Sequence, residues 1–272
     1  MGLARDTQQG GDAGTRNKTS TTSAQLRTVQ VSVTSEAAIL ITDGQGTRVG
    51  FDTEKNSVVN EIPGAVINNE TRFTTYVLPF DKSGQPYTII ISGKPLKNRV
   101  ETNLTLTGPG FLVGFKGIHL GAGENLTAMI GADGRQLAFT AGQSGETPTL
   151  AYAVSAGHGK PSYKFEISTL TLTVGKTVSA TLDTNGGRLF FRDDDEKRNK
   201  YSVLIRRTNP DGTQNLYQRY DISFGATDNY VMEYGKWDGQ GSVCFKVDDG
   251  KGFDQSICVE MPNEAGAQQK NQ

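Results

Sequence analysis

An internal repeat constrains the fold more than any other feature of the sequence. Between residues 111 and 262, apolar residues recur in the same order at intervals of about 52 residues. Two sets show the register: Leu126, Val178 and Tyr230, and then Phe139, Phe191 and Phe245. Each unit reads as short strands joined by turns, with one apolar face. A unit of three or four strands cannot bury such a face alone, so we expect the copies to pack together.

The same period-two alternation of apolar and polar residues also precedes the repeat. It is clear in residues 29–33 and again in residues 100–106, and turn residues follow at intervals of about 8–12 positions. This pattern is typical of antiparallel sandwiches. We therefore predict an all-β chain of tandem antiparallel β-sandwich domains, of Ig-like or jelly-roll-like type.

The sequence Gly108-Pro109-Gly110 interrupts the alternation, and we place a domain boundary there. We expect a first sandwich domain over residues 27–108. A second sandwich region over residues 111–262 would form either one large sandwich or two small ones. Residues 1–26 are rich in Gly, Thr, Ser and Gln and are predicted to be a flexible arm, and residues 263–272 are predicted to be a disordered tail.

Composition limits the partners that the chain can have. The net charge is −1, and basic residues are interleaved with acidic ones, so we expect no nucleic-acid binding. Apolar runs are far shorter than the roughly 20 residues that cross a bilayer, so we expect no membrane insertion. No signal-peptide pattern is visible in the first residues. An extracellular chain of this kind would therefore be a mature form or part of a larger multidomain protein.

Two cysteines flank a predicted hairpin turn. Asp248-Asp249-Gly250-Lys251-Gly252 is a turn signal, and a hairpin centred on Lys251 places Cys244 opposite Cys258. Residues directly opposed on one face of a sheet lie close to disulfide distance. The alternative is a pair of buried thiols. A disulfide would indicate an oxidising compartment.

Two acidic runs follow matching strands of the repeat. We consider calcium as a cofactor there, because closely spaced carboxylates can supply the oxygen ligands that calcium takes. The alternative is a solvated acidic turn that keeps a hairpin soluble. The candidate ligands are Asp193, Asp194, Asp195, Asp248 and Asp249.

The single tryptophan suggests a second kind of site. Trp237 lies in a glycine-containing segment with Tyr234 and Asp238. An exposed aromatic ring with polar neighbours can stack on a sugar ring, so these three residues are candidate contacts for a carbohydrate or protein ligand. The alternative is that Trp237 covers one end of a sandwich core.

Familiar catalytic arrangements are missing from the sequence. The two histidines, His119 and His158, lack the partners of a nucleophilic triad. Gly175-Lys176-Thr177 has Leu170 where a phosphate loop needs glycine. Paired carboxylates for glycosidic chemistry are harder to exclude, because their separation cannot be read from a sequence. We expect no enzyme activity, with a carboxylate-dependent glycosidase as the remaining alternative.

Residues 42–65, TDGQGTRVGFDTEKNSVVNEIPGA, resemble a segment common in the C-terminal halves of large bacterial secreted or surface proteins. That segment typically contains a Thr-Asp-Pro turn, Gly-Arg-Arg and Gly-x-Asp-Pro, and ends in Asn-Glu-Ile-Pro-Gly-Ala. Gly44 and Thr53 stand here where prolines are usual. Residues 189–248 are similar to another such module, through LFFRDDDEKRNKY and MEYGKWDGQG. In those proteins these regions follow a catalytic or von Willebrand-type domain.

The resemblance implies an extracellular or cell-surface location and a non-catalytic role, and it carries over no functional residue. Together with the repeat and the turn density, it favours a structural or interaction module of a secreted protein. The alternative is an accessory module that binds a carbohydrate or a protein.

Overall fold

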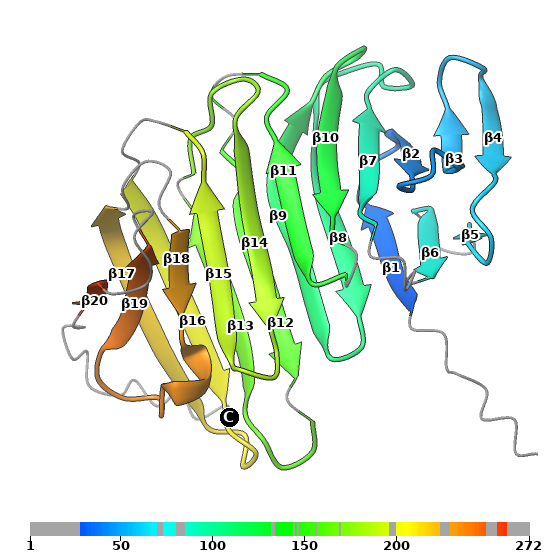
Figure 1. Ribbon diagram of the computed structural model, residues 1–272. Coiled ribbons are helices and arrows are strands. Elements are labelled where there is room, and N and C mark those ends of the chain that lie inside the picture. Colours follow the sequence, from blue (N-terminus) through cyan, green and yellow to red (C-terminus); the bar gives the residue numbers. More distant parts are fainter. Residues whose placement is uncertain are drawn as a thin grey trace, which may run out of the picture.

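The computed structural model confirms the all-β sandwich. It describes residues 28–69, 73–79, 85–131, 134–143, 145, 147–155, 157–168, 170–195, 200–223, 229–248 and 255–259. Two large antiparallel sheets pack face to face (Figure 1). The predicted arm, residues 1–26, and the predicted tail, residues 263–272, lie outside the described residues. None of the described residues belongs to a helix that is long and apolar enough to cross a membrane.

The two sheets contain nine and eleven strands. In spatial order, the nine-stranded sheet contains β17 (Gln214–Ser223), β16 (Lys200–Thr208), β13 (Ser162–Ser168), β12 (Thr149–Ser155), β9 (Phe111–Leu120), β8 (Val100–Gly108), β1 (Thr28–Val33), β6 (Thr75–Pro79) and β5 (Val66–Asn68). The eleven-stranded sheet contains β20 (Gln255–Val259), β19 (Val243–Asp248), β18 (Asn229–Met232), β15 (Arg188–Asp193), β14 (Thr177–Asp183), β11 (Gln136–Thr140), β10 (Asn125–Ile130), β7 (Tyr87–Ser92), β2 (Ala38–Thr42), β3 (Arg48–Asp52) and β4 (Ser57–Asn60). A 3-10 turn, η1 (Tyr234–Lys236), joins β18 to β19.

Hairpins alternate between the two layers along the second half of the chain (Figure 1). The hairpins β8–β9, β12–β13 and β16–β17 belong to the nine-stranded sheet, and β10–β11, β14–β15 and β18–β19 belong to the other. One hairpin in each layer therefore takes up one interval of about 52 residues. Residues in matching register occupy corresponding strands, since Leu126, Val178 and Tyr230 lie in β10, β14 and β18.

Both sheets continue across the predicted domain boundary. Gly108 ends β8 and Phe111 begins β9, so the tripeptide between the expected domains forms the turn of a hairpin. Gly110 has φ 79°, a conformation that glycine adopts without strain. Strand β10 of the second region also pairs with β7 of the first. The described strands of both regions therefore share two continuous sheets, while independent folding of either region stays a prediction.

The core lies between the layers and follows from strand alternation. In β14, Val178, Ala180 and Leu182 are buried, and the residues between them are partly exposed. Phe115 of β9 and Phe139 of β11 meet across the layers, with ring centroids 5.2 Å apart. Each such buried large apolar side chain contributes roughly 1.5–3 kcal/mol to the free energy of folding. The alternation thus determines which face of each strand remains available for a ligand.

The segment of residues 42–65 consists of turns held by its own polar residues. Asp43 accepts hydrogen bonds from the backbone N–H of Gln45 and of Thr47, which closes the β2–β3 turn. Arg48 donates to Asp52 at 2.8 Å and contacts Glu61 at 3.4 Å, so it ties β3 to the residue after β4. These matched residues of the resemblance have structural partners within the segment.

Gly50 is the glycine of the Gly-x-Asp part of the resembled segment, and its backbone conformation explains why glycine stands there. Its φ is 127°, and an added Cβ would lie 2.1 Å from the carbonyl oxygen of Ile39 on the neighbouring β2. A side chain at this position would push β2 and β3 apart. Glycine is therefore required there for close strand approach.

Candidate ligand-binding face

A depression of about 390 Å³ lies on the eleven-stranded sheet. It extends over β11, β14, β15, β18 and β19, which are neighbours in that order in the sheet. Core-facing and solvent-facing residues alternate in these strands, so Ser179 and Thr181 of β14 point away from the core. The depression is consequently on the outer face of the sandwich. Its outward-facing lining consists of Gln136, Ser179, Thr181, Phe190, Arg192, Asn229 and Asp248.

Strand register produces this depression. Ala138 of β11 lies opposite Ser179 of β14, so two small side chains stand side by side in the sheet. On the next strand, Ser179 lies opposite Arg192 and Thr181 lies opposite Phe190. Within the lining, the small side chains of Ser179 and Thr181 therefore lie beside the larger side chains of Arg192 and Phe190.

The polar groups of the depression are varied and balanced in charge. One row across the sheet carries Ser179, Arg192, Asn229 and Asp248 on successive strands. Arg192 supplies one positive charge and Asp248 one negative charge, with the amide of Asn229 between them. Neighbouring strands lie about 4.8 Å apart, so the two charged residues are about 10 Å apart at the backbone. The row offers donors and acceptors without a net charge.

Phe190 provides the apolar part of the lining. It is half-buried, and the guanidinium carbon of Arg188 lies 5.5 Å from the centroid of its ring. Asp183 holds Arg188 through an ion pair of 2.6 Å. The pKa of Asp183 lies below its usual value, first because the backbone N–H of Gly186 donates to it and second because of Arg188. A charged contact thus orients the arginine over the ring.

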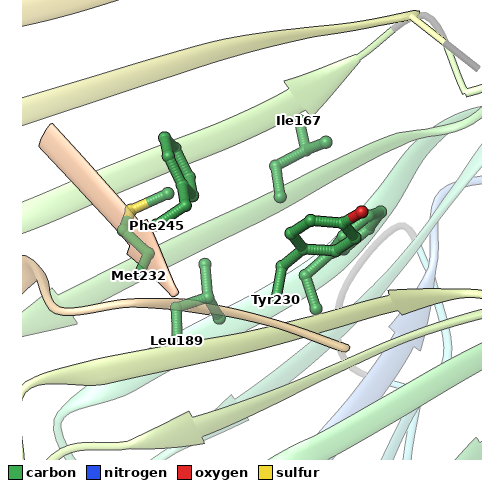
Figure 2. Close-up of a pocket in the computed structure, with 6 residues that line it drawn as sticks. Ile167, Leu189, Tyr230, Met232 and Phe245 are labelled. Carbon is green, nitrogen blue, oxygen red and sulfur yellow. The ribbon is translucent and has the colours of Figure 1, made fainter. Parts of the chain in front are cut away.

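An internal cavity between the sheets is too small to be a ligand site. It measures about 10 Å³ and is enclosed by apolar side chains from both layers (Figure 2). Ile167 comes from β13 of the nine-stranded sheet, and the other lining residues come from the opposite sheet. A space of this size without polar partners does not hold ordered water. We interpret it as a packing gap.

The structure does not bring Trp237, Tyr234 and Asp238 together as a surface site. Trp237 is only 6% exposed, and its ring meets Tyr217 of β17 edge-on, with centroids 6.3 Å apart. Its indole N–H donates to the carbonyl of Gln240 at 3.1 Å. Trp237 therefore covers the end of the core, as the alternative interpretation held. The prediction that it stacks on a ligand is wrong, because η1 turns the ring inward.

Tyr234 is likewise part of the core. It is 3% exposed and packs against Tyr163 and Phe165, each with ring centroids 4.9 Å away. Burial raises the pKa of Tyr234 to about 12. Asp238 is exposed instead, and its carboxylate accepts the backbone N–H of Gln240 at 2.8 Å. The three residues therefore face different environments.

The acidic run Asp193–Asp195 begins at the last residue of β15. Each of its three carboxylates accepts hydrogen bonds from a different group of the protein. Asp193 is buried and accepts hydrogen bonds from the hydroxyl of Tyr201 at 2.5 Å and from the N–H of Asp195 at 2.9 Å. Asp194 accepts from the N–H of Thr177 at 2.5 Å. Asp195 is also buried and accepts from the N–H and hydroxyl of Thr173. The expectation of a solvated turn is wrong for Asp193 and Asp195.

The predicted calcium ligands do not assemble among the described residues. No group of three or more acidic, histidine or cysteine side chains there is placed to hold a metal ion. Asp248 lies in β19 and lines the depression, whereas Asp193 and its neighbours point toward their own hydrogen-bond donors. Asp249 lies outside the described residues. The hypothesis of calcium binding therefore has no assembled site in the described part of the chain.

The cysteine register agrees with the hairpin prediction. Cys244 of β19 lies opposite Cys258 of β20 in the antiparallel register of the two strands. The turn between these strands, residues 249–254, lies outside the described residues.

Sequence reasoning missed the depression. No motif marks the lining residues Gln136, Ser179, Arg192 and Asn229, and their only signal in the sequence was a solvent-facing place in the period-two pattern.

Comparison with protein-family models, with curated proteins and with solved structures finds no match to this chain.

Proposed function

We propose that this chain is a non-catalytic structural and interaction module of a secreted or cell-surface protein. The depression on the eleven-stranded sheet is its docking surface. The observation that carries the proposal is the polar, charge-balanced lining of that depression, to which five neighbouring strands contribute. A site on strands keeps its geometry better than one on loops.

The lining supports a binding role over catalysis. Asp248 is the single carboxylate among its described residues. Glycosidic bond cleavage normally uses two carboxyl groups on opposite sides of the bond. His119, which lies in β9 of the other sheet, contributes nothing to this face.

A carbohydrate is the second candidate, and the lining favours it among neutral ligands. Arg192, Asn229 and Gln136 are planar polar groups that can exchange paired hydrogen bonds with neighbouring hydroxyls. Phe190 offers an apolar surface beside them, against which the C–H groups of a sugar ring can pack. The combination suits a neutral polyhydroxylated ligand better than an anion or a metal ion.

Titration of immobilised neutral polysaccharides with the intact chain tests whether the depression binds a carbohydrate. Arg192→Ala and Asn229→Ala should each weaken binding by about tenfold, because each removes hydrogen bonds at the depression. Arg206→Ala is the matched control, since Arg206 is an exposed arginine of β16 in the opposite sheet. Binding that Arg206→Ala weakens and Arg192→Ala leaves unchanged would place the site elsewhere.

A further inference from the structure

We propose that two copies of this chain associate through β17, forming one continuous sheet across a twofold axis at Gln218. Strand β17 is the last strand of the nine-stranded sheet and pairs only with β16 among the described residues. It contains ten residues. About half of its backbone N–H and C=O groups point away from β16, as on any edge strand, and can pair with another strand.

The outward side chains of β17 are unusually apolar for an edge. Leu216 is 50% exposed and Tyr220 is 63% exposed. Gln218 lies between them, and its amide donates to the hydroxyl of Tyr220. Gln218 also lies opposite Leu204, a half-buried residue of β16 that extends the apolar strip. Edge strands normally carry charges at such positions to prevent pairing.

The order of these residues identifies a second copy as the partner. Leu216 and Tyr220 stand two positions before and two positions after Gln218. Two antiparallel β17 strands related by a twofold axis at Gln218 therefore place Leu216 of each copy opposite Tyr220 of the other. An isologous contact of this kind needs a self-complementary surface, and the strand provides one.

Charge selects this register over its neighbours. With Gln218 on the axis, Arg219 of each copy lies opposite Tyr217 of the other. A shift that places Arg219 on the axis would set two arginines directly opposite each other, which is destabilising. A shift that places Tyr217 on the axis would pair Leu216 with Gln218 and leave the apolar residues unmatched. Register changes of one residue are excluded because they would oppose core-facing and outward-facing positions.

The other described edges are poorer partners. Strand β5, at the far end of the same sheet, has three residues, and the two edges of the eleven-stranded sheet, β4 and β20, have four and five, against ten in β17. A head-to-tail contact between β17 and β5 would leave most of β17 uncovered. The register between β16 and β17 shifts between Val203–Arg219 and Tyr201–Ile222, so Tyr220 lies within a bulge, and this bulge lets Ile222 turn back into the core while Tyr220 stays outside. Residues 214–219 keep a regular register.

Sedimentation of the intact chain over a range of concentrations tests this proposal. We expect a monomer–dimer equilibrium whose dissociation constant rises by about tenfold or more in Leu216→Lys and in Tyr220→Lys. Val174→Lys is the matched control, because Val174 is 56% exposed and lies outside β17. Circular dichroism checks that each variant is folded.

Cross-linking tests the axis itself. In Gln218→Cys the two introduced thiols face each other and should oxidise to a covalent dimer, since opposed Cβ atoms lie about 5 Å apart. In Gln214→Cys the two thiols lie roughly 27 Å apart in the proposed dimer and should not link. The unsubstituted chain shows any background from Cys244 and Cys258.

Three results would overturn the proposal. They are a chain that stays monomeric at about 100 µM, assemblies larger than a dimer, and a dimer that Leu216→Lys and Tyr220→Lys leave intact. The proposed interface contains no residue of the depression. A negative result for dimerisation would therefore leave the proposal of ligand binding untouched, and the reverse also holds.

Discussion

Cys244 of β19 lies directly opposite Cys258 of β20 in the register of the eleven-stranded sheet. Directly opposed residues of antiparallel strands have Cβ atoms about 4.5–5.5 Å apart, which is close to the separation that a disulfide needs. Their pairing would join the last two strands of the sheet covalently.

We therefore predict that the oxidised chain contains this disulfide. Closing a loop of about 15 residues is worth roughly 3 kcal/mol in chain entropy, so reduction should lower the free energy of unfolding by about that amount. Urea unfolding with and without reductant measures the difference, and alkylation followed by mass spectrometry counts free thiols. Cys244→Ser should abolish the effect of reductant. Two freely alkylated thiols in the unreduced, denatured chain would contradict the prediction.

Trp237 should contribute to stability rather than to binding. Because it is buried against Tyr217, Trp237→Ala should lower the free energy of unfolding by about 3–5 kcal/mol. Trp237→Phe keeps an aromatic ring at the same place and should cost less than half as much. Urea unfolding followed by circular dichroism compares the two variants with the natural chain. An alanine variant of unchanged stability would show that the ring does not cover the core in solution.

Calcium should leave the thermal midpoint unchanged. A ligand that binds only the folded chain raises the midpoint. Asp193, Asp194 and Asp195, however, already accept hydrogen bonds, from Tyr201, Thr177 and Thr173 respectively. Thermal unfolding in millimolar calcium and in chelator, with magnesium as the ionic control, measures the effect. A calcium-specific rise would show that the chain forms a site outside the described geometry.

Acid should destabilise the chain through the network around Arg48. The pKa of Glu61 is lowered chiefly by its hydrogen bond with Arg48, and the pKa of Asp52 is lowered first by the backbone N–H of Lys55 and then by other donors that include Arg48. Both carboxyl groups are therefore more acidic when folded than their ordinary values of 4.5 and 3.8. Their contribution is present above those values and is lost as the pH falls through the lower folded pKa values.

A substitution isolates this contribution. Arg48→Met should lower the midpoint at pH 7 by about 2 °C. The difference from the natural chain should shrink as the pH falls through the lowered pKa values of the two carboxyl groups, because protonation removes their interaction with Arg48. Arg206→Met on the opposite sheet is the control for loss of an exposed arginine. A difference that persists unchanged at low pH would indicate that Arg48 acts through packing alone.

Local pattern was sufficient to predict the strands and the fold class. Alternation in residues such as Val178, Ala180 and Leu182 repeats every two positions, and it records directly which side of a strand meets the core. The Cys244–Cys258 register could also be predicted, because a hairpin relates residues that are close in the sequence. The sequence left two interpretations of Trp237 open, a ligand contact and a residue that covers the core, since a residue in a connecting turn has no periodic neighbours to show whether it faces inward.

The sequence by itself determined which residues form strands, which face of each strand is apolar, and how the last hairpin is aligned. Only the tertiary structure decided that the two regions share continuous sheets. It also decided that Asp193 and Asp195 are buried, and that Ser179, Arg192 and Asn229 meet on one face. The physical reason is the distance along the sequence over which each kind of information acts. Hydrophobic alternation acts along a strand, whereas the depression and the acidic caps depend on alignment between strands that are tens of residues apart.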